Sequence, residues 1–196
     1  MSSPLNLIAD PDFAEIRGQI EERLQHWADD LDLQAFADLL DPMMRRVLHG
    51  AFQWVGASEG TIWLADMAEK ALIAAYNTGS DADELVGFRQ PLNQGIISLV
   101  FANEQPYCEN EIGAREAHDS TLDQKLGKRT GAMLAVPFHF AFGLRGVISC
   151  VQFLERDSPA PGFHARHIDE ISLSARLVER LINSRLIAAI VGLEDV

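Results

Sequence analysis

The sequence has little cysteine and no long apolar run, and these absences exclude several classes of protein. Its two cysteines, Cys108 and Cys150, cannot form the disulfide framework of a small secreted domain. The longest stretch without a charged residue, 130–144, contains a proline and a histidine and is shorter than the roughly 20 apolar residues of a membrane span. No basic flank precedes an apolar run at the N-terminus. We therefore expect no secretory signal and a reduced, cytoplasmic protein.

Positive charge is also scarce. The 196 residues carry 16 basic and 29 acidic side chains, which leaves a formal net charge of −13. Non-specific binding of nucleic acid, or of an anionic membrane surface, requires a basic patch. We therefore expect neither partner. With 47% hydrophobic residues, the chain has the balance of a single globular domain with accessory segments.

A first helix is predicted from residue 11, because Asp10 and Pro11 form a cap followed by a proline at the first helical position. The apolar residues that follow are spaced three and four apart, as in a heptad stripe. They are Phe13, Ile16, Ile20, Leu24, Trp27 and Leu31. This stripe is consistent with packing on the chain's own domain or with a coiled-coil seam between two chains. Residues 1–33 are interpreted as an N-terminal dimerising helix.

The pattern changes near residue 60 from helical to strand-like. Two short helices are expected before this point, at 33–40 and 43–55, and 77–89 is expected to be a polar loop. Strands are predicted at 60–65, 71–76, 106–108, 132–140 and 146–154, and helices at 95–103 and 164–191. Two pairs of neighbouring strands form hairpins, which favours an α+β fold with an antiparallel sheet of five to six strands.

Several short motifs follow one another at regular intervals through the middle of the chain. They are Pro91-Leu92, Gly95-Ile96, Val100 and Glu104-Gln105-Pro106, then Asp123, Gly127 and Thr130 leading into 133–137, then Gly146-Val147, Phe163 and Asp169-Glu170. This ordered series resembles the GAF family, whose domains are sensory modules of signalling proteins. The resemblance covers residues 34–187 and leaves 188–196 as a tail.

The resemblance implies a GAF/PAS-like fold, in which helices from both chain ends cover one face of the central antiparallel sheet. A ligand pocket is implied on the other face, beneath a crossover drawn from 85–131. The implied role is that of a non-catalytic regulatory domain in signal transduction, which binds a small molecule or a protein partner. The candidate ligand-binding residues are Phe88, Arg89, Ile97, Phe101, Asn110, Asp123, Thr130 and Met133. The alternative is a pure dimerisation or interaction module whose pocket is filled by its own side chains.

The chemistries associated with the family match the residues only in part. In members that bind cyclic nucleotides, Asn110 and Asp123 have counterparts, but Glu111 stands where a lysine is expected and would repel a phosphate. Members that attach a bilin use a cysteine followed by histidine, whereas Cys108 is followed by Glu109. We therefore predict no cofactor.

Catalysis and metal binding are weakly supported. One branch of the family reduces free methionine sulfoxide with cysteines clustered around the pocket, whereas the two cysteines here lie 42 positions apart. His164 and His167 lack a third ligand for a metal ion. We predict neither an enzyme nor a metal site, with thiol-dependent reduction as the less favoured alternative.

Apolar residues on two sides of the last helix predict a homodimer, because a helix on a monomer's surface needs only one apolar face. The second stripe could also be covered by the N-terminal helix of the same chain. A two-fold dimer is the commonest oligomer. The candidate interface residues are Ile16, Ile20, Leu24, Trp27, Leu173, Leu177 and Leu181.

Overall fold

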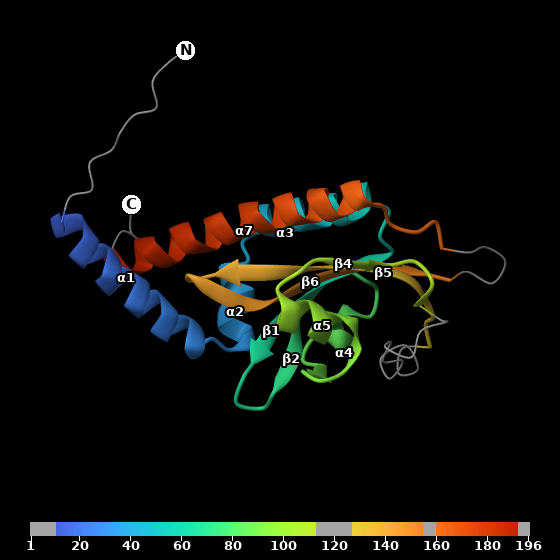
Figure 1. Ribbon diagram of the computed structural model, residues 1–196, viewed down its shortest axis with the longest axis horizontal. Coiled ribbons are helices and arrows are strands. Elements are labelled where there is room, and N and C mark those ends of the chain that lie inside the picture. The colour runs from blue at the N-terminus through green and yellow to red at the C-terminus, as the bar shows by residue number, and fades with distance from the viewer. Residues whose placement is uncertain (1–10, 113–126, 155–159, 192–196) are drawn as a thin grey trace, which may run out of the picture.

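The computed structural model describes residues 11–112, 127–154 and 160–191. A central sheet separates two unequal helical layers (Figure 1). The long last helix, α7 (Ala165–Val191), lies beside α3 (Pro42–Trp54) on one face of the sheet. The short helices α4 (Ala82–Leu85) and α5 (Gly95–Asn103) lie on the other face. Helix α1 (Pro11–Asp29) meets the C-terminal part of α7.

The sheet is antiparallel and six-stranded, in the order β3-β2-β1-β6-β5-β4. The strands are β1 (Glu59–Asp66), β2 (Ala71–Asn77), β3 (Arg89–Pro91), β4 (Tyr107–Glu109), β5 (Thr130–Phe140) and β6 (Gly143–Phe153). The two hairpins, β1–β2 and β5–β6, occur where the sequence predicts them. The α+β fold, with an antiparallel sheet and the terminal helices on one face, is therefore confirmed.

Aspartates cap the early helices. The carboxylate of Asp32 accepts the backbone N–H of Ala35 at the start of α2 (Leu33–Leu39). Asp41 accepts the N–H groups of Met43 and Met44, and Pro42 occupies the first turn of α3. These caps satisfy N–H groups that have no partner within the helix. Helix α2 begins at the predicted residue 33, and α3 begins one residue before the predicted 43.

The prediction of a loop over 77–89 is wrong in part. Helix α4 lies within it, and Arg89 begins the edge strand β3, which pairs with β2 through three residues. A helix of four residues and a strand of three leave too short a periodic pattern for detection. The helix predicted weakly at 122–126 lies outside the described residues.

Two apolar cores lie on the two faces of the sheet. The first core packs α1, α2, α3 and α7 against the sheet, and its fully buried members include Leu24, Phe36 and Val178. The second core lies under α5 and includes Ile96 and Val147. Leu24 is thus buried within its own chain, and α1 shares the first core with the rest of the domain.

Side chains of α7 protect the free part of β5 that extends beyond β4. The backbone N–H of His139 donates to Oε1 of Glu179 at 2.7 Å, and that of Ala141 donates to Oδ1 of Asn183 at 2.7 Å. Pro137, two residues earlier, has no N–H to offer. Unpaired strand edges promote association with other strands, so these contacts close a surface that would otherwise be available for pairing. Burial raises the pKa of Glu179, although the N–H of His139 opposes this shift.

Among the described residues, no helix combines the length and the apolar character that a membrane span requires.

Candidate functional site

The apolar members of the predicted ligand site lie together on the second core. Ile97 is buried, and Phe88, Phe101 and Met133 are partly buried against the same cluster. Phe88 meets Trp63 edge to face, with ring centroids 6.5 Å apart. The indole N–H of Trp63 donates to Oγ of Ser149 at 2.9 Å, which fixes the ring. This face therefore carries well-packed apolar side chains of the protein itself.

The polar members of the predicted site are spread over the molecule. Asn110 and Thr130 lie at one end of the sheet. Nδ2 of Asn110 donates to the carbonyl oxygen of Phe163 at 3.0 Å, and Oδ1 accepts the N–H of Phe163 at 2.7 Å. Thr130 is buried at the start of β5, opposite Phe153. Asp123 lies outside the described residues. Asn110 therefore ties the end of β4 to the segment that enters α7.

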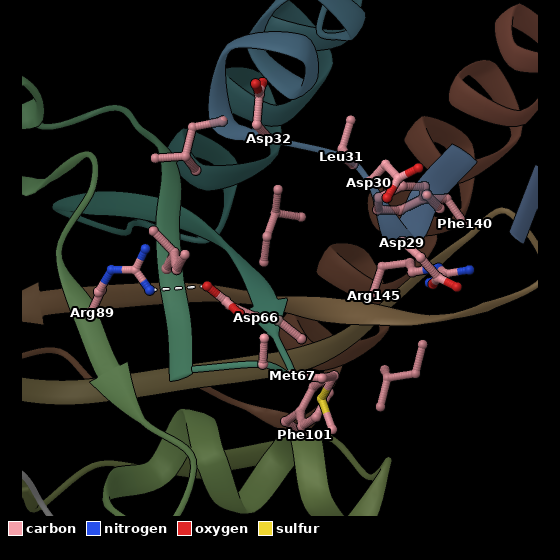
Figure 2. Close-up of a pocket in the computed structure, with 17 residues that line it drawn as sticks. Asp29, Asp30, Leu31, Asp32, Asp66, Met67, Arg89, Phe101, Phe140 and Arg145 are labelled. Carbon is pink, nitrogen blue, oxygen red and sulfur yellow. Dashed lines mark hydrogen bonds and ion pairs between the residues drawn. The ribbon is translucent and has the colours of Figure 1, made fainter. Parts of the chain in front are cut away.

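Arg89 lies towards the other end of the sheet, where a cleft of about 640 Å³ opens. The cleft lies between the connection from α1 to α2, the β1–β2 turn and the start of β6 (Figure 2). Its walls include both Arg89 and Phe101 from the predicted site. A volume of this size is typical of pockets for small molecules.

The apolar lining of the cleft comes from both layers of the protein. Leu31 comes from the α1–α2 connection, Leu64 from β1 and Leu144 from β6, and Phe101 from the end of α5. Most small-molecule sites combine such an apolar lining with a few placed polar groups. A molecule bound in the cleft would therefore contact the end of α1 and the sheet at the same time.

Four of the charged side chains that line the cleft form two ion pairs. Nη1 of Arg89 lies 3.0 Å from Oδ2 of Asp66, across the ends of β3 and β1 (Figure 2). Nη1 of Arg145 lies 2.6 Å from Oδ1 of Asp29, at the last residue of α1. The backbone N–H of Glu69, followed by the Arg89 guanidinium, lowers the pKa of Asp66, which keeps this carboxylate ionised.

The acidic residues of the cleft were missed as site residues. In the sequence, Asp29 and Asp30 lie in a polar segment, and exposure to solvent is enough to account for them. A usable signal existed, because the helix dipole disfavours carboxylates at a helix C-terminus and therefore favours a basic side chain beside them. Arg145 supplies it from 116 residues away, where the sequence alone gives no indication of contact.

A second polar cluster lies at the opposite end of β1. Nζ of Lys128 lies 2.6 Å from Oδ2 of Asp81 and 3.0 Å from Oε2 of Glu59. The Glu59 side chain is only 7% exposed, and a side chain at Gly79 would collide with its carboxylate. Burial alone would lower the pKa of Lys128, but the two carboxylates together raise it. This cluster attaches the chain entering β5 to β1 and to the segment that precedes α4.

Both cysteines lie on the face of the sheet opposite to α5. Cys108 and Cys150 both pair with Leu134, from either side, and all three side chains belong to or pack against the first core. Both thiols are free. Burial raises the pKa of both, and the carboxylate of Glu109 raises that of Cys108 further. The thiolate, which is the reactive form, is therefore disfavoured at both positions.

Within 11–112, 127–154 and 160–191, no group of three or more histidine, cysteine or acidic side chains is arranged to hold a metal ion.

Comparison with solved structures defines the fold. The GAF domain of a phosphoenolpyruvate-protein phosphotransferase from Coxiella burnetii superposes with a TM-score of 0.59 at 16% identity, over 89% of this chain and 95% of that one. Residues 122 to 287 of a methyl-accepting chemotaxis protein give 0.58 at 21% identity, over 87% and 98%. The free methionine-R-sulfoxide reductase of Neisseria meningitidis, in complex with its substrate, gives 0.55 at 15% identity, over 93% and 98%.

The chain thus has the GAF-domain fold that its motifs predict. No protein-family model matches the sequence, and no curated protein does. The same fold occurs in a domain of a phosphotransferase, in a chemotaxis protein and in a reductase, so the fold alone does not define the function.

Proposed function

We propose that this protein is a non-catalytic regulatory GAF-type domain, which binds a small molecule and transmits the change through its terminal helices to a second copy or a protein partner. The observation that carries the proposal is the position of the cleft. One wall is the end of α1 and the other is formed by the sheet and its turns. A molecule bound there would contact both and would stabilise one orientation of α1 relative to the domain.

The non-catalytic part of the proposal is supported by the positions of the thiols. A thiol-dependent reductase needs an activated thiolate close to its substrate. Cys108 and Cys150 instead contact the first core, away from both α5 and the cleft, and their pKa values are raised. The reductases among the structural neighbours make the alternative worth testing.

We expect no turnover when the protein is incubated with free methionine sulfoxide and excess dithiothreitol. The reason is that both thiols contact the first core, so neither can react with a molecule bound in the cleft or on the α5 face of the sheet. Loss of sulfoxide is followed by chromatography, with the Cys108→Ser/Cys150→Ala variant as the blank. Turnover above this blank would contradict the non-catalytic proposal.

The proposed route of output is a set of exposed apolar side chains on α1, α3 and α7, here called the apolar strip. Of the predicted interface residues, Leu24 is buried, and Ile20, Trp27 and Leu181 pack partly against the first core. Three remain exposed, namely Ile16, Leu173 (59%) and Leu177 (44%). On α3, Met43 and Trp54 (77%) are exposed as well. Large apolar side chains exposed on two neighbouring helices favour association with another surface, so the strip supports a homodimer.

We expect light scattering at micromolar concentration to give twice the 21.7 kDa mass of one chain. The Leu173→Glu/Leu177→Glu variant should give the monomer mass, because it places two charges in the strip without disturbing a buried residue. Arg176→Glu changes the net charge by the same two units at another exposed position of α7 and should remain dimeric. A monomeric parent, or a dimeric double variant, would contradict the proposed interface.

A further inference from the structure

We propose that the cleft at the end of α1 binds a small organic cation, that is, a protonated amine on an apolar body. This inference rests on the proposed function, since it assigns a ligand class to the cleft through which that function would operate. The cleft lies beyond the end of β1, between two turns and the α1–α2 connection, and not beneath the crossover that the resemblance implies.

The charges around the cleft favour a cation. Four aspartates and two arginines line it, which leaves a formal charge of two negative units. They are Asp29, Asp30, Asp32 and Asp66, with Arg89 and Arg145. Asp30 is exposed and forms no ion pair with the described residues. Figure 2 places Asp30 on the α1–α2 connection and Asp66 on the facing end of β1, so carboxylates occur on both sides.

The backbone adds to this preference. Helix α1 ends at Asp29, in the wall of the cleft, so its last carbonyl groups and the negative end of its dipole lie there. One of these carbonyls, that of Gln25, already accepts a hydrogen bond from Arg145 at 3.5 Å. The N-terminus of α2, which follows α1 in the chain, is capped by the carboxylate of Asp32. This carboxylate neutralises the positive end of the α2 dipole.

The arginines of the cleft are poorly placed to receive an anion. Arg89 is paired with Asp66 and Arg145 with Asp29. The remaining donor of Arg145, Nε, is buried and has no hydrogen-bond partner among the described residues, so a molecule in the cleft does not reach it. An anion would have to approach the remaining donors of Arg89 against the repulsion of the neighbouring Asp66 carboxylate, whereas a cation meets carboxylates with unused lone pairs.

The rest of the lining defines the body of the ligand. Leu31, Leu64, Ile73, Phe101 and Leu144 offer apolar contact, and about 640 Å³ accommodates a bicyclic ring with a short chain. A small inorganic cation would leave these contacts unused. The residues together therefore favour an amine carried on an aromatic or branched aliphatic group.

Three probes that share one body but differ in charge test the inference. They are 1-naphthaleneethylamine, 1-naphthaleneethanol and 1-naphthaleneacetate, titrated at low salt into ¹⁵N-labelled protein. We expect the amine to shift the amide signals of Leu31, Ala68 and Leu144, with an affinity about tenfold above that of the alcohol. We expect the carboxylate to bind more weakly than either, because the cleft repels it.

Two single-charge variants locate the interaction. Asp30→Asn should weaken amine binding about threefold, the size expected for one exposed charge, and should leave the alcohol unchanged. Asp83→Asn removes the same charge from α4, outside the cleft, and should alter neither. Equal binding of alcohol and amine, or amine shifts confined to other residues, would overturn the cation inference alone. Failure of all three probes to shift the cleft signals at millimolar concentration would overturn it together with the proposed ligand-binding role of the cleft.

Discussion

Replacing Gly146 by alanine is expected to lower the free energy of unfolding by more than about 3 kcal/mol, through strain between packed strands. Gly146 lies in β6 opposite Leu64 of β1. A Cβ at this position would stand 1.8 Å from the carbonyl oxygen of Trp63 and 3.2 Å from Cα of Leu64. Both atoms belong to the backbone of a central strand, so neither can rotate away. The two strands would have to separate, which disturbs the cores on both faces.

Urea unfolding followed by circular dichroism measures this loss. Gly50→Ala is the matched control, because Gly50 is exposed on α3 and an added Cβ would meet nothing within 4 Å. There the substitution should stabilise the protein by about 0.5–1 kcal/mol, the difference in helix propensity between the two residues. A Gly146→Ala protein that unfolds within about 1 kcal/mol of the parent would show that β1 and β6 do not approach as closely as described.

The strands and long helices could be predicted because each carries a repeated local signal. The alternating and apolar runs that become β5 and β6 are each 11 residues long in the structure, which is enough for the pattern to be recognised. Strand β3 could not be predicted in this way. Its three residues include Gln90, which is buried although polar, and its pairing depends on the register of β2.

The heptad stripe of α1 shows a different limit. Its spacing indicates one apolar face but does not indicate what covers it. In the structure Leu24 is fully buried by the chain's own first core, whereas Ile16, two turns earlier, is exposed. Intramolecular packing thus accounts for the part of the stripe around Leu24, whereas a seam between two chains stays a prediction for the exposed part around Ile16.

The cleft depends on contacts that no local pattern contains. The ion pairs Asp29–Arg145 and Asp66–Arg89 form only when the strands have paired in the order of the folded sheet. The resemblance directs attention to the crossover, where Phe88, Ile97 and Met133 pack on the second core. Arg89 and Phe101 are the predicted residues that also line the cleft, which is why the sequence identifies part of it.

Replacing Lys128 by methionine is expected to cost about 3 kcal/mol of stability at neutral pH, because it leaves the carboxylate of Glu59 buried without its counter-charge. The change retains an unbranched side chain against the ring of Phe153, which Nζ approaches to 4.8 Å. The loss of stability should therefore arise more from the unpaired carboxylate of Glu59 than from lost packing against Phe153. Lys70→Met, at an exposed position in the β1–β2 turn, is the matched control and should change stability by less than about 0.5 kcal/mol.

A double-mutant cycle with Glu59→Gln separates the buried pair from the rest of the cluster. If the loss arises from the orphaned carboxylate, Glu59→Gln/Lys128→Met should be more stable than Lys128→Met, with a coupling of about 1–3 kcal/mol. The dependence on pH gives a second check through Asp81, whose pKa is lowered chiefly by its hydrogen bond with Lys128. A lowered folded-state pKa stabilises the protein fully above the ordinary value of 3.8, and this contribution disappears as the pH falls through the lowered value. The difference in the free energy of unfolding between the parent and Lys128→Met should therefore become smaller below pH 3.8. Two results would contradict the roles given to Lys128 and its carboxylate partners. One is a difference that does not change with pH, and the other is a double variant that is no more stable than Lys128→Met.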